Sequence, residues 1–202
     1  MAHEMTGTSK IRPRGRRLAS RFARDARGLA AVEFAFILPL MLTLIFGTIE
    51  VSSGVAIDRK VTLVARSLSD LVSQGTQVTQ TDLTNFFGLG SAIMSPYPVT
   101  ATTMTQKVSA ISIDASKVAK VVWSYRGVVA GSSITVTKEY AKDTVITTIP
   151  PGLLVPNTQL IWSEVTYTYI PIVGFVMKGG FPLSDVCFTR PRQSETVTGP
   201  TS

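Results

Sequence analysis

Few side chains in this 202-residue chain combine into a set that could do chemistry. The one histidine, His3, lies in a polar amino-terminal arm, and the one cysteine, Cys187, excludes an internal disulfide and is expected as a buried thiol in a strand. Glu164 and Asp185 could be imagined as an acid pair, but we interpret them as exposed strand carboxylates. The sequence holds no glycine-rich phosphate loop, no paired metal ligands and no serine–base set. It therefore predicts no enzymatic activity, no metal site and no cofactor.

One short stretch carries a chemical signal, at the border between a basic arm and an apolar run. Gly28 ends the arm, Leu29 and three more small or apolar residues follow, and Glu33 and Phe34 come next. This order resembles the processing site of type IV prepilins, in which a membrane peptidase cuts after the glycine and the glutamate becomes the fifth residue of the mature chain. The resemblance implies a prepilin peptidase as a partner, and a Glu33 that meets the new amino terminus of a neighbouring subunit. The alternative is a glutamate in the first turns of a helix, where the helix dipole favours it.

Residues 29–57 are predicted to form a transmembrane helix. The first 21 of them hold a single charge, Glu33, and at about 1.5 Å per residue they extend for about 30 Å, the thickness of a bilayer's hydrocarbon core. Pro39 and Gly47 lie inside this run, and both residue types are better tolerated in membrane helices than in soluble ones. A buried helix of a soluble protein is the alternative, and the charges on the flanks argue against it.

The charges before this helix predict its orientation. Residues 1–28 hold eight basic and two acidic residues, so this leader carries +6 of the formal net charge of +7. Because short arms rich in lysine and arginine stay in the cytoplasm, we expect a single-pass membrane protein whose carboxyl-terminal domain lies across the membrane from the arm. The resemblance to prepilins implies that this is the bacterial inner membrane and that the domain is periplasmic or extracellular. Basic arms also bind nucleic acid or anionic lipid, but the position beside an apolar span favours topology, and we predict no nucleic-acid partner. Residues 1 to about 15 are expected to be disordered.

The wider stretch from Arg24 to Ser73 resembles the amino-terminal signature of the TadE-like proteins, the pseudopilins of tight-adherence (Flp) pilus systems. The matching residues lie at the start, middle and end of the apolar run: Gly28, Val32-Glu33-Phe34, Leu38-Pro39, Gly47 and Glu50. Residues 165–171 and 189–192 also resemble the closing strands of the family.

The resemblance implies a membrane-anchored minor pilin or pilus-assembly factor, with roles in adhesion or secretion. Its helix would associate with other pilin or pseudopilin subunits and with the assembly platform. The candidate residues for this self-association are Glu33, Pro39, Gly47 and Glu50.

The helical pattern continues beyond the span. Apolar residues recur at intervals of three and four and predict an amphipathic continuation over residues 58–75, ended by Gly75: Val61, Val64, Ala65, Leu68, Leu71 and Val72. A shorter helix is predicted over residues 79–94, with Thr81 or Asp82 as its cap.

The rest of an exported domain over residues 76–202 is predicted to be rich in strands. Strands are expected at 107–113, 117–128, 158–172 and 183–190, a loop at 149–157, a strand or a helix start at 132–140, and a loose tail after 191. In the second strand, one face is expected to hold Ala119, Val121, Trp123 and Tyr125. A long helix followed by antiparallel strands predicts an α+β, pilin-like fold in which the helix packs on the sheet.

A rival function is a secreted or anchored binding module. Residues 37–49 could be the apolar core of an ordinary signal peptide cut after Ala56, and an uncut chain would be a plain single-span anchor. The amino terminus of the mature protein separates these possibilities: Leu29 for the pilin-like protein, Ile57 for the secreted module and Met1 for the anchor.

Overall fold

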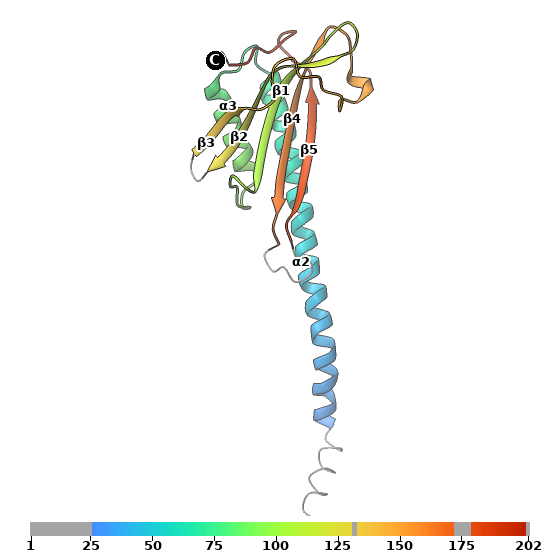
Figure 1. Ribbon diagram of the computed structural model, residues 1–202. Helices are drawn as coiled ribbons and strands as arrows, with labels where there is room; N and C mark the ends of the chain where they lie inside the picture. Colours follow the sequence, from blue (N-terminus) through green and yellow to red (C-terminus); the bar gives the residue numbers. More distant parts are fainter. Residues whose placement is uncertain (1–25, 131–132, 172–178, 201–202) are drawn as a thin grey trace, which may run out of the picture. The chain divides into compact units, whose positions relative to one another are not determined.

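The computed structural model describes residues 26–130, 133–171 and 179–200, so the expected disorder of the leader lies outside the described residues. The chain divides into two compact units, one ending at Gly47 and the other beginning at Thr48. The described elements are, in chain order, α2 (Ala26–Ser73), α3 (Gln80–Ile93), β1 (Met104–Ile113), β2 (Ala119–Ala130), β3 (Ser133–Lys138), the short 3-10 helix η1 (Pro151–Leu153), β4 (Thr158–Tyr169) and β5 (Phe181–Thr189) (Figure 1). The α+β class predicted from the sequence is confirmed.

The described part of the first unit is the beginning of α2. This element is one continuous α-helix of 48 residues that contains Pro39. Its end at Ser73 is the end that the apolar periodicity and Gly75 predict. The residues from 48 onward belong to the second unit.

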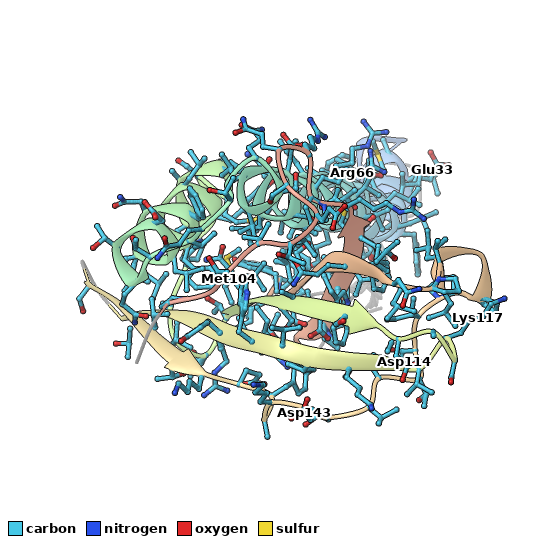
Figure 2. All side chains as sticks on the ribbon, turned by 90° about the horizontal axis from the view of Figure 1, so that it is seen from above. Glu33, Arg66, Met104, Asp114, Lys117 and Asp143 are labelled. Carbon is cyan, nitrogen blue, oxygen red and sulfur yellow. The ribbon has the colours of Figure 1, made fainter. Side chains whose placement is uncertain are left out.

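The second unit is a five-stranded antiparallel sheet with helices on one face. The strand order is β3-β2-β1-β4-β5, which makes β1 central and leaves β3 and β5 at the edges. Viewed from above, α3 and the part of α2 from residue 48 onward lie on the same side of the sheet, the side on which Met104 of β1 is labelled, and Asp143 lies on the opposite side (Figure 2).

The main core fills the space between the helices and the sheet. Val61, Val64 and Leu68 of α2 are buried there against Ile161 and Val165 of β4, because an apolar stripe with helical period meets strand residues that alternate in and out. On the inward face of β4, Val165, Tyr167 and Tyr169 are all buried.

Close packing of α3 on β2 depends on a glycine. The Phe87 ring lies directly over Gly127, where an added Cβ would be 2.3 Å from two ring carbons. Phe87 itself is fully buried. Gly127 therefore lets the helix approach a strand that a side chain would hold away.

A smaller apolar cluster lies on the opposite face of the sheet, under the chain between β3 and β4. It contains Ile111, Ile113 and Leu160, with Ala119 of β2. Both faces of the sheet are thus partly covered.

A bulge in β2 explains one wrong expectation. The register shifts between Ala110 and Ile111, so that Trp123 pairs with Ala110 whereas Val121 pairs with Ile111. The extra residue reverses the alternation. Ala119 consequently lies in the outer cluster while Tyr125 lies in the main core, and the four residues expected on one face are divided between two.

Three other local expectations are corrected or resolved. The cap of α3 is Thr79, whose hydroxyl accepts from the amide of Asp82 in a capping box, so neither Thr81 nor Asp82 is the cap residue. The ambiguous segment at 132–140 contains strand β3. The predicted loop at 149–157 holds η1 and no strand.

The segment after residue 191, which was expected to be loose, is docked as far as it is described. Val197 is buried in the main core, its carbonyl accepts from the Trp123 indole at 2.9 Å, and its amide donates to Gln159 at 2.6 Å. Arg192 forms an ion pair with Asp70 of α2. The polar composition of the segment after residue 191 gave no sign of these few specific contacts.

Candidate functional site

The first part of α2 presents an apolar surface without cover from the described chain. Residues 28–45 are all exposed, and they include Leu29 at 65% and Phe36 at 78%. Among the described residues, α2 is the one helix long and apolar enough to cross a membrane, judged by length and composition. An apolar surface of this size is unfavourable in water.

The predicted processing residues lie in the first turns of this helix. An added Cβ at Gly28 would meet nothing within 4 Å, so the backbone there is open to approach. Leu29 and Glu33 are four residues apart and thus on the same face. Both are exposed, as is Phe34.

Pro39 does not interrupt α2. The hydroxyl of Thr43 donates to the Pro39 carbonyl at 2.8 Å, which gives this polar group a partner within the helix. Such back-bonding is typical of hydroxyl residues in apolar helices.

The four residues nominated for self-association differ in exposure. Glu33 and Pro39 are exposed and Gly47 is half-buried, whereas Glu50 is only 1% exposed and lies in the second unit. The side chain of Glu50 is therefore covered by its own chain in this structure.

Polar contacts attach the later turns of α2 to the rest of the second unit. Lys60 donates to the carbonyls of Ile93 and Ser95 at 2.7 and 2.9 Å. The Thr189 hydroxyl of β5 donates to the Ser69 carbonyl at 3.1 Å. The spacing of Lys60 in the sequence gives no sign of this anchoring contact.

The outer face of the sheet carries a polar network that the sequence did not reveal. Lys107 forms an ion pair with Glu139 at 2.9 Å, and the Tyr140 hydroxyl donates to Glu164 at 3.0 Å. Lys107 also donates to the Tyr140 hydroxyl at 3.3 Å. These contacts attach the segment after β3 to strands β1 and β4.

Burial and neighbouring charges shift the pKa values in this network. Burial raises the pKa of Glu164, against the lowering effects of the Tyr140 hydrogen bond and the Lys107 charge. Burial and the negative charge of Glu164 raise the pKa of Tyr140. Burial alone would lower the pKa of Lys107, but its contacts with Glu139 and Tyr140 raise it overall.

Glu164 and Asp185 do not form an acid pair. Glu164 is opposite Val186, and Asp185 is opposite Val165. Because directly paired residues share a face and neighbours alternate, the two carboxylates lie on opposite faces of the sheet. Cys187 is a free, half-buried thiol.

An aromatic stack continues the outer network. Trp162 lies between Tyr140 and Phe188, with ring centroids 5.6 and 6.0 Å away and nearly parallel planes. The three rings come from three separate segments, so no local sequence pattern could have predicted the stack. Together with the polar contacts it organises this face, and within the described residues no group of three or more His, Cys, Asp or Glu side chains could hold a metal ion.

The exposed apolar surface described above lies on the first part of α2. The match to a known protein family includes the same helix. The model of the family described as TadE-like protein matches residues 28–67, which confirms the resemblance found in the amino-terminal signature. No curated protein and no solved structure matches the chain.

Proposed function

We propose that this chain is a membrane-anchored pilin-like subunit or assembly component of a tight-adherence (Flp) pilus system. One observation carries the proposal: the TadE-like match at residues 28–67 covers the same helix whose first turns expose an apolar surface. The overlap of the match and the apolar surface supports a pilus-associated membrane protein. We further propose how this protein is processed, how it is oriented and with which partners it assembles.

The apolar surface supports anchoring on physical grounds. Residues 29–49 extend for about 30 Å as a helix, and lipid or neighbouring apolar helices would cover the side chains that water disfavours. The basic leader before Gly28 would keep the amino terminus in the cytoplasm. The folded second unit would then lie on the other side of the inner membrane, as a domain that follows the span.

Processing by a prepilin peptidase would remove residues 1–28. The bond between Gly28 and Leu29 lies in the first turn of α2, where the amides lack partners within the helix and the turn opens most easily. The new amino group at Leu29 would be the partner of Glu33 from a neighbouring subunit. Pro39, Gly47 and Glu50 complete the proposed association region, with Glu50 the member already covered by its own chain.

The secreted-module rival has less structural support. A signal peptidase cut after Ala56 would fall inside continuous α2 and directly before Ile57, which is fully buried in the main core. That cut would also remove Glu50 and Gly54, both buried in the second unit. An uncut single-span anchor is the other rival. It leaves α2 and the second unit intact, and it predicts an amino terminus at Met1 instead of Leu29.

Glu33→Gln tests the pilin-like role most specifically. If Glu33 pairs with a neighbour's amino terminus, this variant should reach the membrane and be processed normally, yet be recovered less in pilus or pseudopilus complexes, because a charge–charge contact in an apolar setting weakens when one partner becomes neutral. If the only effect of Glu33 is that its charge makes insertion into lipid less favourable, the variant should insert slightly better and assemble as before. Undiminished recovery in complexes would contradict the proposed pairing.

Reporter fusions test the orientation. A reporter fused after Thr198 should behave as exported and one fused at Ser20 as cytoplasmic. Replacing Arg21, Arg24 and Arg27 with acidic residues should disturb insertion or orientation. Unchanged behaviour would refute the explanation from charge.

A further inference from the structure

An apolar groove lies between α2 and the edge strand β5 in the second unit. This open groove has a volume of about 280 Å³ and is lined by Val51, Gly54, Val55, Asp58, Phe181 and Leu183. We propose that this groove receives the corresponding helical segment, Val51 to Asp58, of a second copy of this chain in the same membrane. This inference rests on the proposed membrane anchoring and names a partner for it.

Both walls of the groove present apolar groups to solvent. Val51 and Val55 are 57% and 50% exposed although they follow directly on the apolar run of α2. On the other wall, Phe181 is held by an edge-to-face contact with Tyr169, 5.4 Å between ring centroids. The shape is therefore maintained by the fold and does not need a ligand to form.

A glycine keeps the floor of the groove open. An added Cβ at Gly54 would lie 3.5 Å from the Phe181 ring, an ordinary van der Waals contact. A larger side chain at this position would instead occupy the space between helix and strand. A larger side chain at position 54 can therefore fill the groove, because its Cβ fits without a clash.

Depth in the membrane selects a second copy as the occupant. Copies anchored by the same helix in the same orientation present the same residues at the same height. The side chains of Val51 and Val55 are one turn apart and form a ridge. A neighbour's ridge therefore lies at the height of this groove.

Charge also favours a second copy over lipid. Asp58 lines the groove and lies about 13 Å beyond residue 49, past the proposed span, where no acyl chains are available to fill an apolar groove. Arg59 is the next residue, at a height that differs by only about 1.5 Å along the helix. Among the described residues neither Asp58 nor Arg59 has an ion-pair partner, so Arg59 of one copy is available to Asp58 of the other.

Disulfide crosslinking between two differently tagged full-length copies tests the proposal in native membranes. In a Cys187→Ser background, one copy carries Leu183→Cys and the other carries Val55→Cys, which lines the groove nearer to the height of Leu183. Because a disulfide requires Cα atoms within about 7 Å, an oxidant should produce a heterodimer with both tags. Gly54→Leu in the acceptor copy should abolish this heterodimer, whereas Gly54→Ala should retain it.

Ala56→Cys in place of Val55→Cys is the matched control. Ala56 is half-buried, lies about 1.5 Å further along the helix and does not line the groove. A heterodimer yield no greater than this control would overturn the proposal. A benzophenone amino acid at position 55 that labels lipid or another protein, and not a second copy, would overturn it as well.

The two proposals fail in different ways. Variants that fractionate with the membrane and show normal processing but do not crosslink would remove only the groove contact. A chain absent from the membrane fraction would contradict the proposed function, and the groove contact with it.

Discussion

The hydroxyl of Ser163 in β4 donates to the carbonyl of Ala65 in α2 at 2.6 Å, across 98 positions of sequence. Both residues are fully buried. Small residues on the two elements bring helix and strand close enough for a side chain of the sheet to reach the backbone of the helix. This contact joins the helix of the family match to the sheet that the match does not cover.

Ser163→Ala should destabilise the protein by about 1 kcal/mol, the usual net contribution of one hydrogen bond. The Ala65 carbonyl keeps its own helical partner, which limits the loss. Thermal unfolding of the full chain in detergent would measure it. Ser112→Ala, at an exposed position of β1, is the control, and an equal decrease for both variants would show that the buried contact contributes nothing.

Tyr167→Ala should cost about 3–5 kcal/mol, because it removes a large ring from the main core. Tyr167 is 2% exposed and its hydroxyl donates to the Pro98 carbonyl at 3.0 Å. Tyr167→Phe should cost only about 1 kcal/mol through the lost hydrogen bond. Thr166→Ala, on the exposed face of the same strand, should change the melting temperature least, and equal effects at 166 and 167 would show that the faces of β4 are wrongly assigned.

Gly127→Ala should destabilise by about 1–3 kcal/mol, the typical cost of overpacking a core. The added carbon would overlap the buried Phe87 ring, which can move only by displacing α3. Gly152→Ala provides a control, because a Cβ there meets nothing within 4 Å. The double variant with Phe87→Leu should lose less than the sum of the two single variants, and strict additivity would argue against this clash.

The raised pKa of Glu164 predicts a pH dependence of stability. Because folding raises the pKa of this carboxyl above its ordinary value of 4.5, its contribution is most favourable below that value and is lost as the pH rises through the folded-state pKa. The melting temperature of the natural protein, relative to Glu164→Gln, should therefore rise as the pH is lowered through the folded-state pKa of Glu164 towards 4.5. Other carboxyls titrate in both proteins and cancel in the difference. A relative decrease on acidification would mean that Glu164 is stabilised as an anion.

The long helix and the strand pattern could be predicted because both depend on local periodicity. The stripe from Val61 to Val72 and the alternation around Tyr167 each place apolar side chains on one face regardless of the rest of the fold. The change of face within β2 could not be predicted from local periodicity, because it arises from a bulge in the pairing of β2 with β1.

The contacts that complete the fold depend on segments far apart in the sequence. Val197 is one apolar residue in a polar tail, and its burial depends on Trp123 and Gln159. The stack of Tyr140, Trp162 and Phe188 likewise has no local signature. For the candidate site, the composition of α2 predicted an apolar helix, and the motif at Gly28 predicted the processing residues. The groove beside Val55 could not be predicted, because its other wall is formed by β5, which is far away in the sequence.

The central proposal is that α2 anchors a processed pilin-like subunit. Mass measurement combined with amino-terminal sequencing of the membrane-extracted protein tests it most directly. The expected amino terminus is Leu29, and Gly28→Val should block the cut and leave a precursor heavier by the whole basic leader. A natural protein that begins at Met1 would instead be an uncut anchor, and one that begins at Ile57 would have lost the exposed apolar part of α2 while keeping its later turns; either result would contradict the account.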